Sequence, residues 1–427
     1  MGFSHKITSL ETISTSPKTL SREKVAISSF DFCLYDTILE VPVELWGKVV
    51  PEENVLMHRE YLLSLEQSER GKLGFHYLLI LQDEKPVGAV YFQSVHFGGE
   101  GLAHFIPTGG DSYGKRLFNK ILALGLGPMV KLMDMKLLVS GNIFMTGENG
   151  IYFRPGLDKA TCANLLRQAA EKVVKRHTDI RIILISELSL PHSEFDIDFN
   201  HCSYHEVKAE ADMSMTIPKE WKSFDDYLQA LSSKYRVRAR KVYRTTAQEG
   251  IICREFQQED FEKYRDRLYH LYNQVMVHSQ FKLAILSKGF FSLQKDIFPT
   301  NYHLYGYFRE GQLIGFISSY HFGQKMEIHY CGMEPETNRP CHLYQRMIYD
   351  MLDLGIRQGV SQLHFGRTAP EIKSTIGAVP THNYAYVKHL SPLFNLFFTP
   401  FLARFLQPKE YVYRNPFKRL EDRDATL

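Results

Sequence analysis

The sequence predicts an α/β fold with mixed sheets, built as two successive units of similar plan. The first observation is length, because 427 residues at roughly 100–200 residues per domain make two or three domains. The second is the order of the segments, in which strand patterns and helix patterns are interspersed along the chain. The third is a repeated pattern of an apolar strand, a short charged turn and a second strand that opens with an aliphatic-Gly pair. It occurs at His76–Gly88, continuing to Phe97, and at His303–Gly315, continuing to Phe322, and it predicts two β-hairpins.

The spacing of the two hairpins places a boundary near residues 205–215. We therefore expect an N-terminal unit over residues 1–208, a C-terminal unit over 209–389 and an apolar extension over 390–427. The first unit contains a helix over Asp158–Arg176 and a continuous apolar strand over Ile180–Ile185. A Gly/Asn-rich loop over Val139–Gly150 lacks the Gly-Lys-Ser/Thr ending of a phosphate loop, which favours a connector that lines a groove.

The second unit opens with a strand over Asp212–Ile217 and a long helix from Phe224 to about Gln248. Ser223 is a plausible N-cap with Asp226 at the N3 position, and Gly250 ends the helix. The whole arm is expected to cover residues 223–249. The remaining elements are a helix at about Glu259–Val277, a strand over Lys325–Gly332, a helix at about Leu343–Arg357 and a strand over Gln362–Phe365.

Composition limits the class of protein. Hydrophobic residues make up 44% of the chain and charged residues 23%, a globular balance that argues against disorder of the whole chain. The formal net charge is only +3, so anion binding needs a local cluster, and no DNA partner is expected. The six cysteines lack zinc-knuckle spacing and indicate reduced thiols in the cytoplasm, without a metal site. The chain contains no uninterrupted apolar run of 18 residues, so no membrane-spanning helix is expected.

The clearest charge cluster lies on the predicted long helix, where residues 232–244 hold six basic side chains and no acid. Arg236, Arg240 and Arg244 are four residues apart and share one face, which suits phosphate or carboxylate groups. Lys234, Arg238 and Lys241 form a second row. The alternative is a solvated helix face with ion pairs to its neighbours.

Two further segments carry polar groups that suit catalysis. Alternation along the strand at Lys325–Gly332 predicts that Glu327, His329 and Cys331 point to one side. A Glu and a His on one face can serve as base and orienter for the deprotonation of an amine. The alternative is a polar strand face, or a core histidine whose ring nitrogens are satisfied.

The loop over residues 333–340 leads into the next helix with Pro340 near its start. Free amides there, reinforced by Arg339, would accept an anion. Farther along, the last predicted strand ends at Gly366-Arg367, and Lys373 precedes Gly377. Loops at strand ends often carry function in α/β sheets.

These residues resemble the Fem/BioF-like N-acyltransferases of the GNAT superfamily, the type associated with peptidoglycan biosynthesis or recognition. The resemblance covers about Ser223–Lys388. It rests on the basic segment beginning Leu231-Ser-Ser-Lys-Tyr-Arg, the hairpin ending at Gly315, the Phe365-Gly-Arg367 strand end and the segment Glu371–Pro380. The first half resembles a second, diverged GNAT unit through the order of its elements.

The resemblance implies two tandem GNAT-like units and transfer of an acyl or aminoacyl group to an amine. The sequence does not identify the acceptor, and a cell-envelope or lipid precursor is a candidate. The donor would be acyl-CoA, acyl carrier protein or aminoacyl-tRNA, and tRNA is therefore a candidate partner. By analogy, the backbone amides of Cys331, Gly332 and Met333 would polarise the donor carbonyl. Arg236, Arg240, Arg244, Arg339, Arg367 and Lys373 would bind the donor. The absence of glycine from residues 333–342 departs from the usual GNAT pyrophosphate loop and weakens the case for CoA. A degenerate binding protein without chemistry is the remaining alternative.

The segment over residues 390–406 is unusually apolar, although Pro392 and Pro400 interrupt it and Arg404 adds a charge. It would allow peripheral contact with the inner face of a membrane. The alternative is a terminal segment packed on the sheet.

Overall fold

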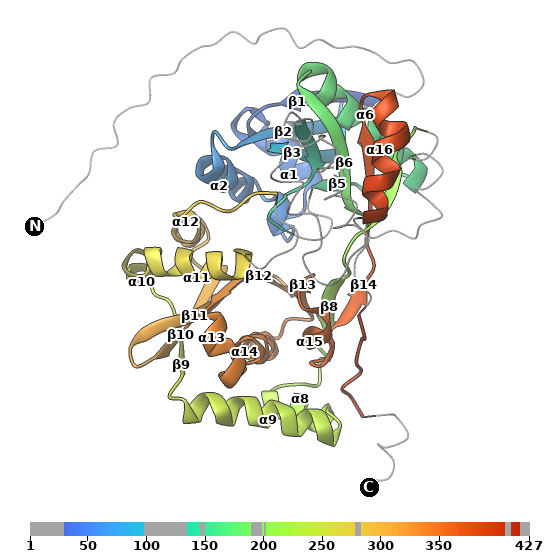
Figure 1. The fold of residues 1–427 in the computed structure, drawn as a ribbon. Helices are drawn as coiled ribbons and strands as arrows, with labels where there is room; N and C mark the ends of the chain where they lie inside the picture. Colours follow the sequence, from blue (N-terminus) through green and yellow to red (C-terminus); the bar gives the residue numbers. More distant parts are fainter. Residues whose placement is uncertain are drawn as a thin grey trace, which may run out of the picture.

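The fold is described from a computed structural model, for residues 30–97, 135–145, 150–188, 199, 202–277, 283–405 and 411–418. Two mixed β-sheets, each covered by helices, form the upper and lower halves of the molecule (Figure 1). This arrangement confirms the predicted α/β class.

Among the described residues, the first sheet has eight strands in the order β1-β2-β3-β4-β6-β15-β7, with β5 paired to β3. The β4–β6 pair is parallel, and the other pairs are antiparallel. Its strands are β1 (Phe30–Tyr35), β2 (Leu73–Gln82), β3 (Lys85–Phe97), β4 (Met135–Ser140), β5 (Ile151–Phe153), β6 (Ile180–Leu188), β7 (His205–Lys208) and β15 (Tyr384–His389).

In the part of the chain that the structure describes, the second sheet has seven strands in the order β14-β8-β13-β12-β11-β10-β9, with one parallel pair, β12–β13. Its strands are β8 (Asp212–Thr216), β9 (Ile252–Glu255), β10 (Tyr302–Arg309), β11 (Gln312–Phe322), β12 (Lys325–Met333), β13 (Gln362–Gly366) and β14 (Val379–Thr381).

The helices cover both faces of each sheet. In the first half they are η1 (Ile38–Glu40), α1 (Val43–Val49), η2 (Val55–Met57), α2 (Arg59–Glu69) and α6 (Lys159–Arg176). In the second half they are α8 (Phe224–Ala230), α9 (Ser233–Gln248), α10 (Gln258–Lys263), α11 (Arg265–Val277), α12 (Phe290–Ile297), α13 (Pro335–Cys341), α14 (Leu343–Arg357) and α15 (Pro370–Ser374). Helix α16 (Pro392–Phe405) packs on β15 and β7 of the first sheet.

Both predicted hairpins are present, as β2–β3 and β10–β11. Each turns through two residues with positive φ, Asp83 (48°) and Glu84 (63°) in the first and Glu310 (51°) and Gly311 (74°) in the second. Such turns match the twist of the flanking strands but favour Gly or Asn. The first turn therefore carries conformational strain at Glu84 that Gly311 avoids in the second.

Glu84→Gly should stabilise the protein by about 1 kcal/mol, because the left-handed conformation is unfavourable for a residue with a Cβ. Urea unfolding of the wild type and the variant measures this difference. Glu310→Gly serves as a comparison at the corresponding first turn position of the second hairpin. A destabilised Glu84→Gly variant would contradict the strain argument.

The prediction of one long helix from Phe224 to about Gln248 is wrong in one respect, because this segment forms two helices, α8 and α9. Leu231 is extended (ψ 144°) and bridges to Phe417, so pairing with the C-terminal segment draws the chain out of the helix. The predicted capping box of Ser223 with Asp226 is confirmed, and Gly250 has the positive φ expected after a helix end (65°). The helix predicted at about Glu259–Val277 is likewise divided, into α10 and α11.

A shared apolar core joins the two halves. It takes alternate residues from β2 and β3, including Tyr77 and Tyr91, and alternate residues from β10 and β11, including Tyr302 and Tyr320. Hydrogen bonds cross the same interface: Gln294 Nε2 on α12 donates to Ser64 Oγ on α2 at 2.7 Å. The opposite sheet faces are covered mainly by α6 in the first half and by α14 in the second. The two units therefore pack against each other as one body.

Strand β15 departs from a simple division of the chain. It follows the second sheet in sequence, within the range expected for the C-terminal unit, yet it lies between β6 and β7 of the first sheet. The chain passes from the first sheet to the second between β7 and β8 and returns to the first sheet at β15. The three-part division stays a prediction.

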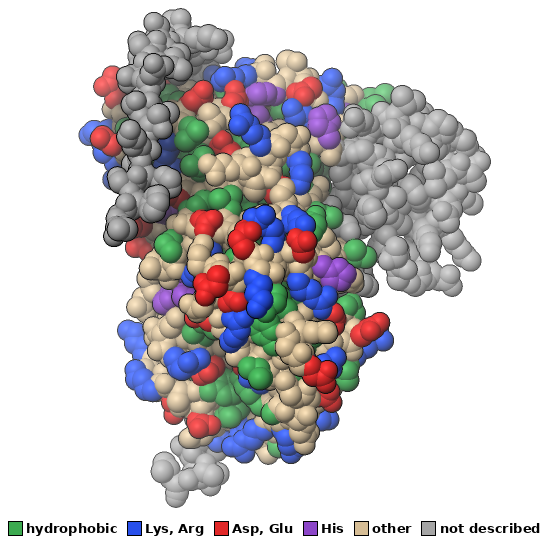
Figure 2. Space-filling model, turned by 90° about the vertical axis from the view of Figure 1, so that its left-hand side faces the viewer, with side chains coloured by type: hydrophobic (Ala, Val, Ile, Leu, Met, Phe, Trp, Pro, Cys, Tyr) green, Lys and Arg blue, Asp and Glu red, His purple; other side chains and the backbone are tan. Residues whose placement is uncertain are grey.

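Two surface features bear on partners. On the face in Figure 2, basic and acidic side chains are interspersed, which fits the small net charge. Helix α16 buries Asn395 and exposes Leu393 and Leu396, each 66% exposed. Within the described ranges, no helix is both long enough and apolar enough to cross a membrane.

Candidate functional site

The parallel strands β12 and β13 part in the middle of the second sheet. They pair at three positions, ending at Glu327 opposite His364. Beyond that point β12 continues to Met333 and β13 to Gly366 without further pairing between them. Backbone groups on the facing edges are thereby left available to other partners.

The equivalent parallel pair of the first sheet, β4 and β6, does not open in this way. Its register runs on to Val139 opposite Leu184, and two side-chain hydrogen bonds extend it. The Ser186 amide donates to Ser140 Oγ at 2.8 Å, and Ser186 Oγ donates to the Ser140 carbonyl. The chemistry of a parted pair is therefore available in the second sheet and not at the corresponding place in the first.

Lys373 of α15 lies against the parted edge of β13. Its side chain is 1% exposed, and Nζ donates to the carbonyls of Phe365 at 2.6 Å and Gly366 at 2.9 Å. Burial lowers the pKa of Lys373 to about 8, opposed by the charges of Cys331 and two acidic residues, Asp212 and Glu210. The ammonium group has three hydrogens, so one remains beyond these two hydrogen bonds.

Glu327 occupies the last paired position of β12. Burial raises the pKa of Glu327 well above its usual range; the negative charge of Asp212 adds to this effect and Lys325 opposes it. The side chain nevertheless keeps a small exposed fraction. A carboxyl group with a raised pKa can exchange protons near neutral pH, which is what a general base requires.

His329 lies on the same side of β12, among aromatic rings. Its ring centroid is 5.0 Å from that of Tyr320, 5.6 Å from Phe290 and 6.1 Å from Tyr302. Neither ring nitrogen has a hydrogen-bond partner among the described residues, so the alternative of a satisfied core histidine is wrong. Burial lowers the pKa of His329 to about 3, which keeps the imidazole neutral and makes it a poor proton acceptor.

The prediction that Cys331 points to the same side as Glu327 and His329 is wrong. The β11–β12 register shifts between Ile317 and Ser319, so one extra residue on β12 reverses the alternation. Tyr330 then packs in the core shared by the two halves, and Cys331 packs on the side of α14. Burial raises the pKa of the Cys331 thiol to about 11, and Lys373 opposes this shift. The thiol is therefore protonated at neutral pH and unsuited to act as a nucleophile.

Gly332 and Met333 are both buried at the end of β12. A Cβ on Gly332 would lie 2.7 Å from the Tyr272 amide nitrogen of α11, so glycine permits the close approach of this helix. Packing accounts for Gly332 without a ligand.

The prediction of a loop over residues 333–340 is wrong for most of that range, because α13 occupies Pro335–Cys341. Pro335 stands in the first turn, where proline is favoured, and Pro340 lies inside the helix. The next helix begins only after His342, which is left-handed (φ 54°). Arg339 is exposed on α13.

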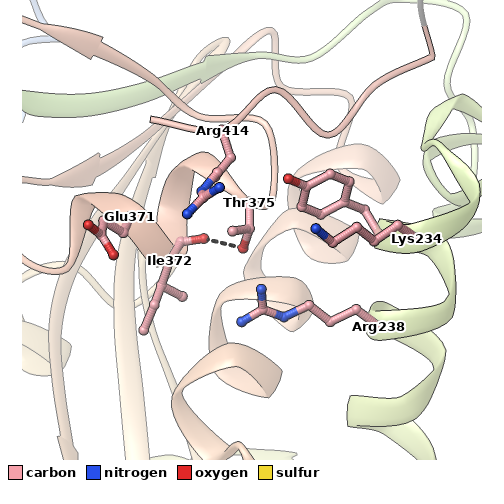
Figure 3. A pocket seen from close by; sticks show the side chains of 7 residues that line it. Lys234, Arg238, Glu371, Ile372, Thr375 and Arg414 are labelled. Carbon is pink, nitrogen blue, oxygen red and sulfur yellow. Dashed lines mark hydrogen bonds between the residues drawn. The ribbon is translucent and has the colours of Figure 1, made fainter. Parts of the chain in front are cut away.

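A cavity of about 240 Å³ lies between α9, α15 and the C-terminal segment 411–418. Its lining includes three cations, Lys234, Arg238 and Arg414, and one carboxylate, Glu371 (Figure 3). Among the described residues, no ion pair joins Glu371 to any of these cations. The cavity thus carries an excess of positive charge that suits a phosphate or carboxylate ligand.

Helix α15 separates this cavity from the parted strands. Glu371, Ile372 and Thr375, from α15 and the residue after it, line the cavity, whereas Lys373 is turned to the carbonyls of β13. A single short element therefore lies between the cation-lined cavity and the parted strands.

The sequence profile of the FemAB-like family, described as peptidoglycan biosynthesis/recognition, matches residues 151–420. This match covers more than half of the chain. The chain belongs to the FemAB-like family. The match confirms the family predicted from the sequence. A search of curated proteins gives no significant match for the FemAB-like chain.

Solved structures show distant similarity to the FemAB-like chain. A tandem GNAT protein from the clavulanic acid biosynthesis pathway is 10% identical, with 85% of this chain and 99% of that chain covered and a TM-score of 0.49. FemX is 11% identical, with 79% and 93% covered and a TM-score of 0.47. A conserved protein from Bacteroides thetaiotaomicron is 9% identical, with 81% and 93% covered and a TM-score of 0.44.

The FemAB-like structure brings some of the predicted site residues together and separates others. Glu327 and His329 share one side of β12, and Cys331 lies on the other, within electrostatic reach of Lys373. Arg367 follows β13 and acts electrostatically on Tyr330. Arg236, Arg240 and Arg244 do not line the cavity between α9, α15 and the segment 411–418, and Arg339 is likewise outside it.

Sequence reasoning missed three contributors to this region: Asp212, Tyr344 and Arg414. Asp212, at the start of β8, acts electrostatically on Glu327, His364 and Lys373. Tyr344 of α14 interacts with Cys331, and Arg414 lines the cation-rich cavity. No motif marks these three positions, because each reaches the site through long-range packing.

Proposed function

We propose that this FemAB-like protein is an N-acyltransferase that uses the parted strands β12 and β13 of the second unit to transfer an acyl or aminoacyl group to an amine. The observation that carries the proposal is the end of β12–β13 pairing at Glu327–His364, with buried Lys373 bound to the carbonyls of Phe365 and Gly366 at the end of β13. The family description supports an amine of a peptidoglycan peptide as the acceptor.

Each residue then has a defined role. Glu327 accepts the proton of the attacking amine, because its raised pKa makes it a stronger base than an ordinary carboxylate. The amine nitrogen forms a bond to the acyl carbon, and the electron pair of the carbonyl moves to its oxygen. The remaining hydrogen of Lys373 Nζ stabilises that oxyanion. Collapse of the intermediate expels the thiolate of a thioester donor, or the tRNA hydroxyl of an aminoacyl ester, which takes up a proton.

The cation-rich cavity serves as the docking site for an anionic donor. It presents Lys234 and Arg238 from α9 and Arg414 from the C-terminal segment. Acyl-CoA, acyl carrier protein and aminoacyl-tRNA all carry phosphate groups or clustered negative charge. The proposed donor-binding side chains of α9 are therefore Lys234 and Arg238, from the second basic row, in place of Arg236, Arg240 and Arg244.

The Lys234→Gln/Arg238→Gln variant should bind the donor at least about tenfold more weakly, because each charge-assisted hydrogen bond contributes about 1.5–3 kcal/mol. Titration of the full chain with each donor class measures the change. Arg236→Gln/Arg240→Gln removes two charges from the same helix outside the cavity and should leave donor affinity within about twofold. Equal losses in both variants would show that only the overall charge of α9 matters.

The reaction itself is tested with the purified full chain, a peptide that carries a free amine, and the three donor classes in separate reactions. Mass spectrometry should detect an amide product with one class of donor. A steep fall of donor affinity with salt would identify aminoacyl-tRNA, since binding dominated by phosphate contacts releases counterions. A donor that raises the melting temperature without forming product would favour the alternative of a binding protein.

For α16 we propose peripheral contact with a membrane, supported by the exposed Leu393 and Leu396 on one side of the helix. Leu393→Gln/Leu396→Gln should reduce flotation of the protein with anionic lipid vesicles. Val379→Gln, which removes an exposed apolar residue from β14, is the control. Unchanged flotation in the double variant would exclude this role for α16.

A further inference from the structure

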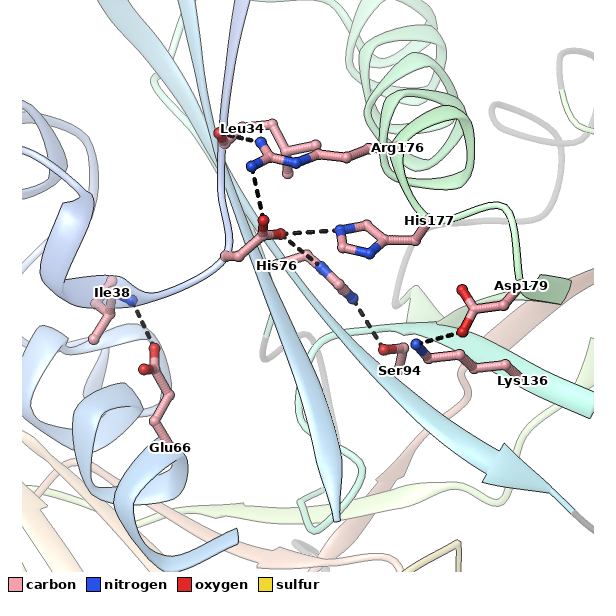
Figure 4. A network of polar contacts seen from close by, with 10 residues as sticks. Leu34, Ile38, Glu66, His76, Ser94, Lys136, Arg176, His177 and Asp179 are labelled. Atoms are coloured by element: carbon pink, nitrogen blue, oxygen red, sulfur yellow. Dashed lines mark hydrogen bonds and ion pairs between the residues drawn. The ribbon is translucent and has the colours of Figure 1, made fainter. Parts of the chain in front are cut away.

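A cluster of two histidines and one carboxylate lies in the first unit, away from the parted strands (Figure 4). Asp36 follows β1, His76 lies on β2 and His177 follows α6. Asp36 Oδ1 lies 3.3 Å from His76 Nδ1 and 3.0 Å from His177 Nε2. One carboxylate oxygen therefore faces one nitrogen from each imidazole.

We propose that Asp36, His76 and His177 form a binding site for a divalent transition-metal ion such as Zn²⁺. Two imidazole nitrogens and one carboxylate oxygen are a donor set that Zn²⁺ accepts, with water as the fourth ligand. The site lies outside the proposed transfer chemistry and does not depend on it.

The distances fit a compact coordination sphere. Bonds of about 2.0–2.2 Å to a tetrahedral Zn²⁺ place neighbouring ligand atoms about 3.3–3.5 Å apart. The two distances from Asp36 Oδ1 are close to this spacing, and all three donor atoms lie within 4.8 Å of one another.

The surroundings orient the ligands as metal sites require. His76 is 3% exposed, and its other nitrogen, Nε2, lies 3.0 Å from Ser94 Oγ, which fixes the ring. Arg176 Nη2 binds the other carboxylate oxygen, Asp36 Oδ2, at 2.8 Å and leaves Oδ1 for the ion. The side chains of Asp36 and His177 are 38% and 24% exposed, so an ion and a water molecule have access.

Two positively charged side chains lie beside the cluster, Arg176 and Lys136. Arg176 Nη2 is paired with Asp36 Oδ2 at 2.8 Å, and Lys136 Nζ is paired with Asp179 at 2.9 Å. Each of these cations therefore already has an acidic partner.

The ion would join three elements that are distant in sequence. The ligands come from the ends of β1 and α6 and from the interior of β2. Binding to the folded state alone stabilises that state, so the expected role is structural.

The test uses the full chain without an affinity tag, treated with a chelator and then titrated with Zn²⁺ or Co²⁺. We expect one ion per chain, a visible absorption band of tetrahedral Co²⁺ and a rise in melting temperature. His177→Gln and Asp36→Asn should each weaken binding by about tenfold or more and remove the Co²⁺ band. His382→Gln, which removes an exposed histidine elsewhere, should bind as the wild type does.

Circular dichroism of each variant without metal establishes that it is folded before its affinity is compared. Less than one ion bound per chain at saturating concentration would overturn the proposal. So would equal affinity in the wild type, His177→Gln and Asp36→Asn. Transfer activity is not a readout here, so failure of the acyltransferase proposal would leave this test unchanged.

Discussion

Glu327→Gln should lower kcat/KM for amide formation by about 10²–10⁴-fold, the usual contribution of a general base. Glutamine keeps the size of the side chain but cannot accept the amine proton. In the wild type, kcat/KM should rise with pH through the raised pKa of Glu327, because only the carboxylate is the active base. The variant should lose this part of the pH profile.

Two further variants make the assignment specific. Glu336→Gln changes an exposed carboxyl group on α13 and should keep full activity. His329→Phe should also remain active and should be more stable by about 1–3 kcal/mol, because it removes two buried ring nitrogens that lack partners. If His329→Phe loses activity while Glu327→Gln retains it, the roles of these two candidates are reversed.

The stability of the protein should rise between pH 8 and pH 10.5 through Lys373. In the folded state this lysine loses its proton near pH 8, whereas in the unfolded chain it keeps the proton until about pH 10.5. Between these values the unfolded state binds more protons, so the free energy of unfolding increases with pH. The whole effect is about 3 kcal/mol, since one pKa unit corresponds to about 1.4 kcal/mol.

Urea unfolding of the wild type and Lys373→Met at several pH values measures this effect. The stability difference between them should shift in favour of the wild type as pH rises from 8 to 10.5. Comparison with the wild type cancels the titration of other groups that both proteins share. Lys263→Met, which replaces an exposed lysine on α10, should show the same pH dependence of the free energy of unfolding as the wild type. If Lys373→Met also shows the pH dependence of the wild type, Lys373 has an ordinary pKa.

Much of the fold was predictable because local patterns and tertiary structure agree. The two hairpins follow from apolar runs separated by turn residues, and α6 follows from helical spacing after Asp158, which caps it. The failures come from distant contacts. Residues near Leu231 continue a helical pattern, yet Leu231 pairs with Phe417, almost 190 residues later in the chain. No local signal reports such a partner.

The candidate site was predictable in its location and less so in its detail. Glu327 and Lys373 were identified from the strand pattern and the family resemblance, and both have perturbed protonation equilibria in the structure. Cys331 was placed on the wrong side because strand alternation assumes an unbroken register, whereas β12 contains an irregularity. The favoured row of arginines on α9 was chosen by spacing alone, but α15 and the segment 411–418 decide which row lines a cavity.

Strand β15 has a consequence for how this protein is made. It fills the place between β6 and β7, so the first sheet is incomplete until residue 389 has left the ribosome. The first sheet therefore keeps an unpaired strand edge while more than 170 further residues are synthesised. Fragments ending near residue 208 should therefore aggregate, and addition of a peptide that spans β15 should restore their solubility.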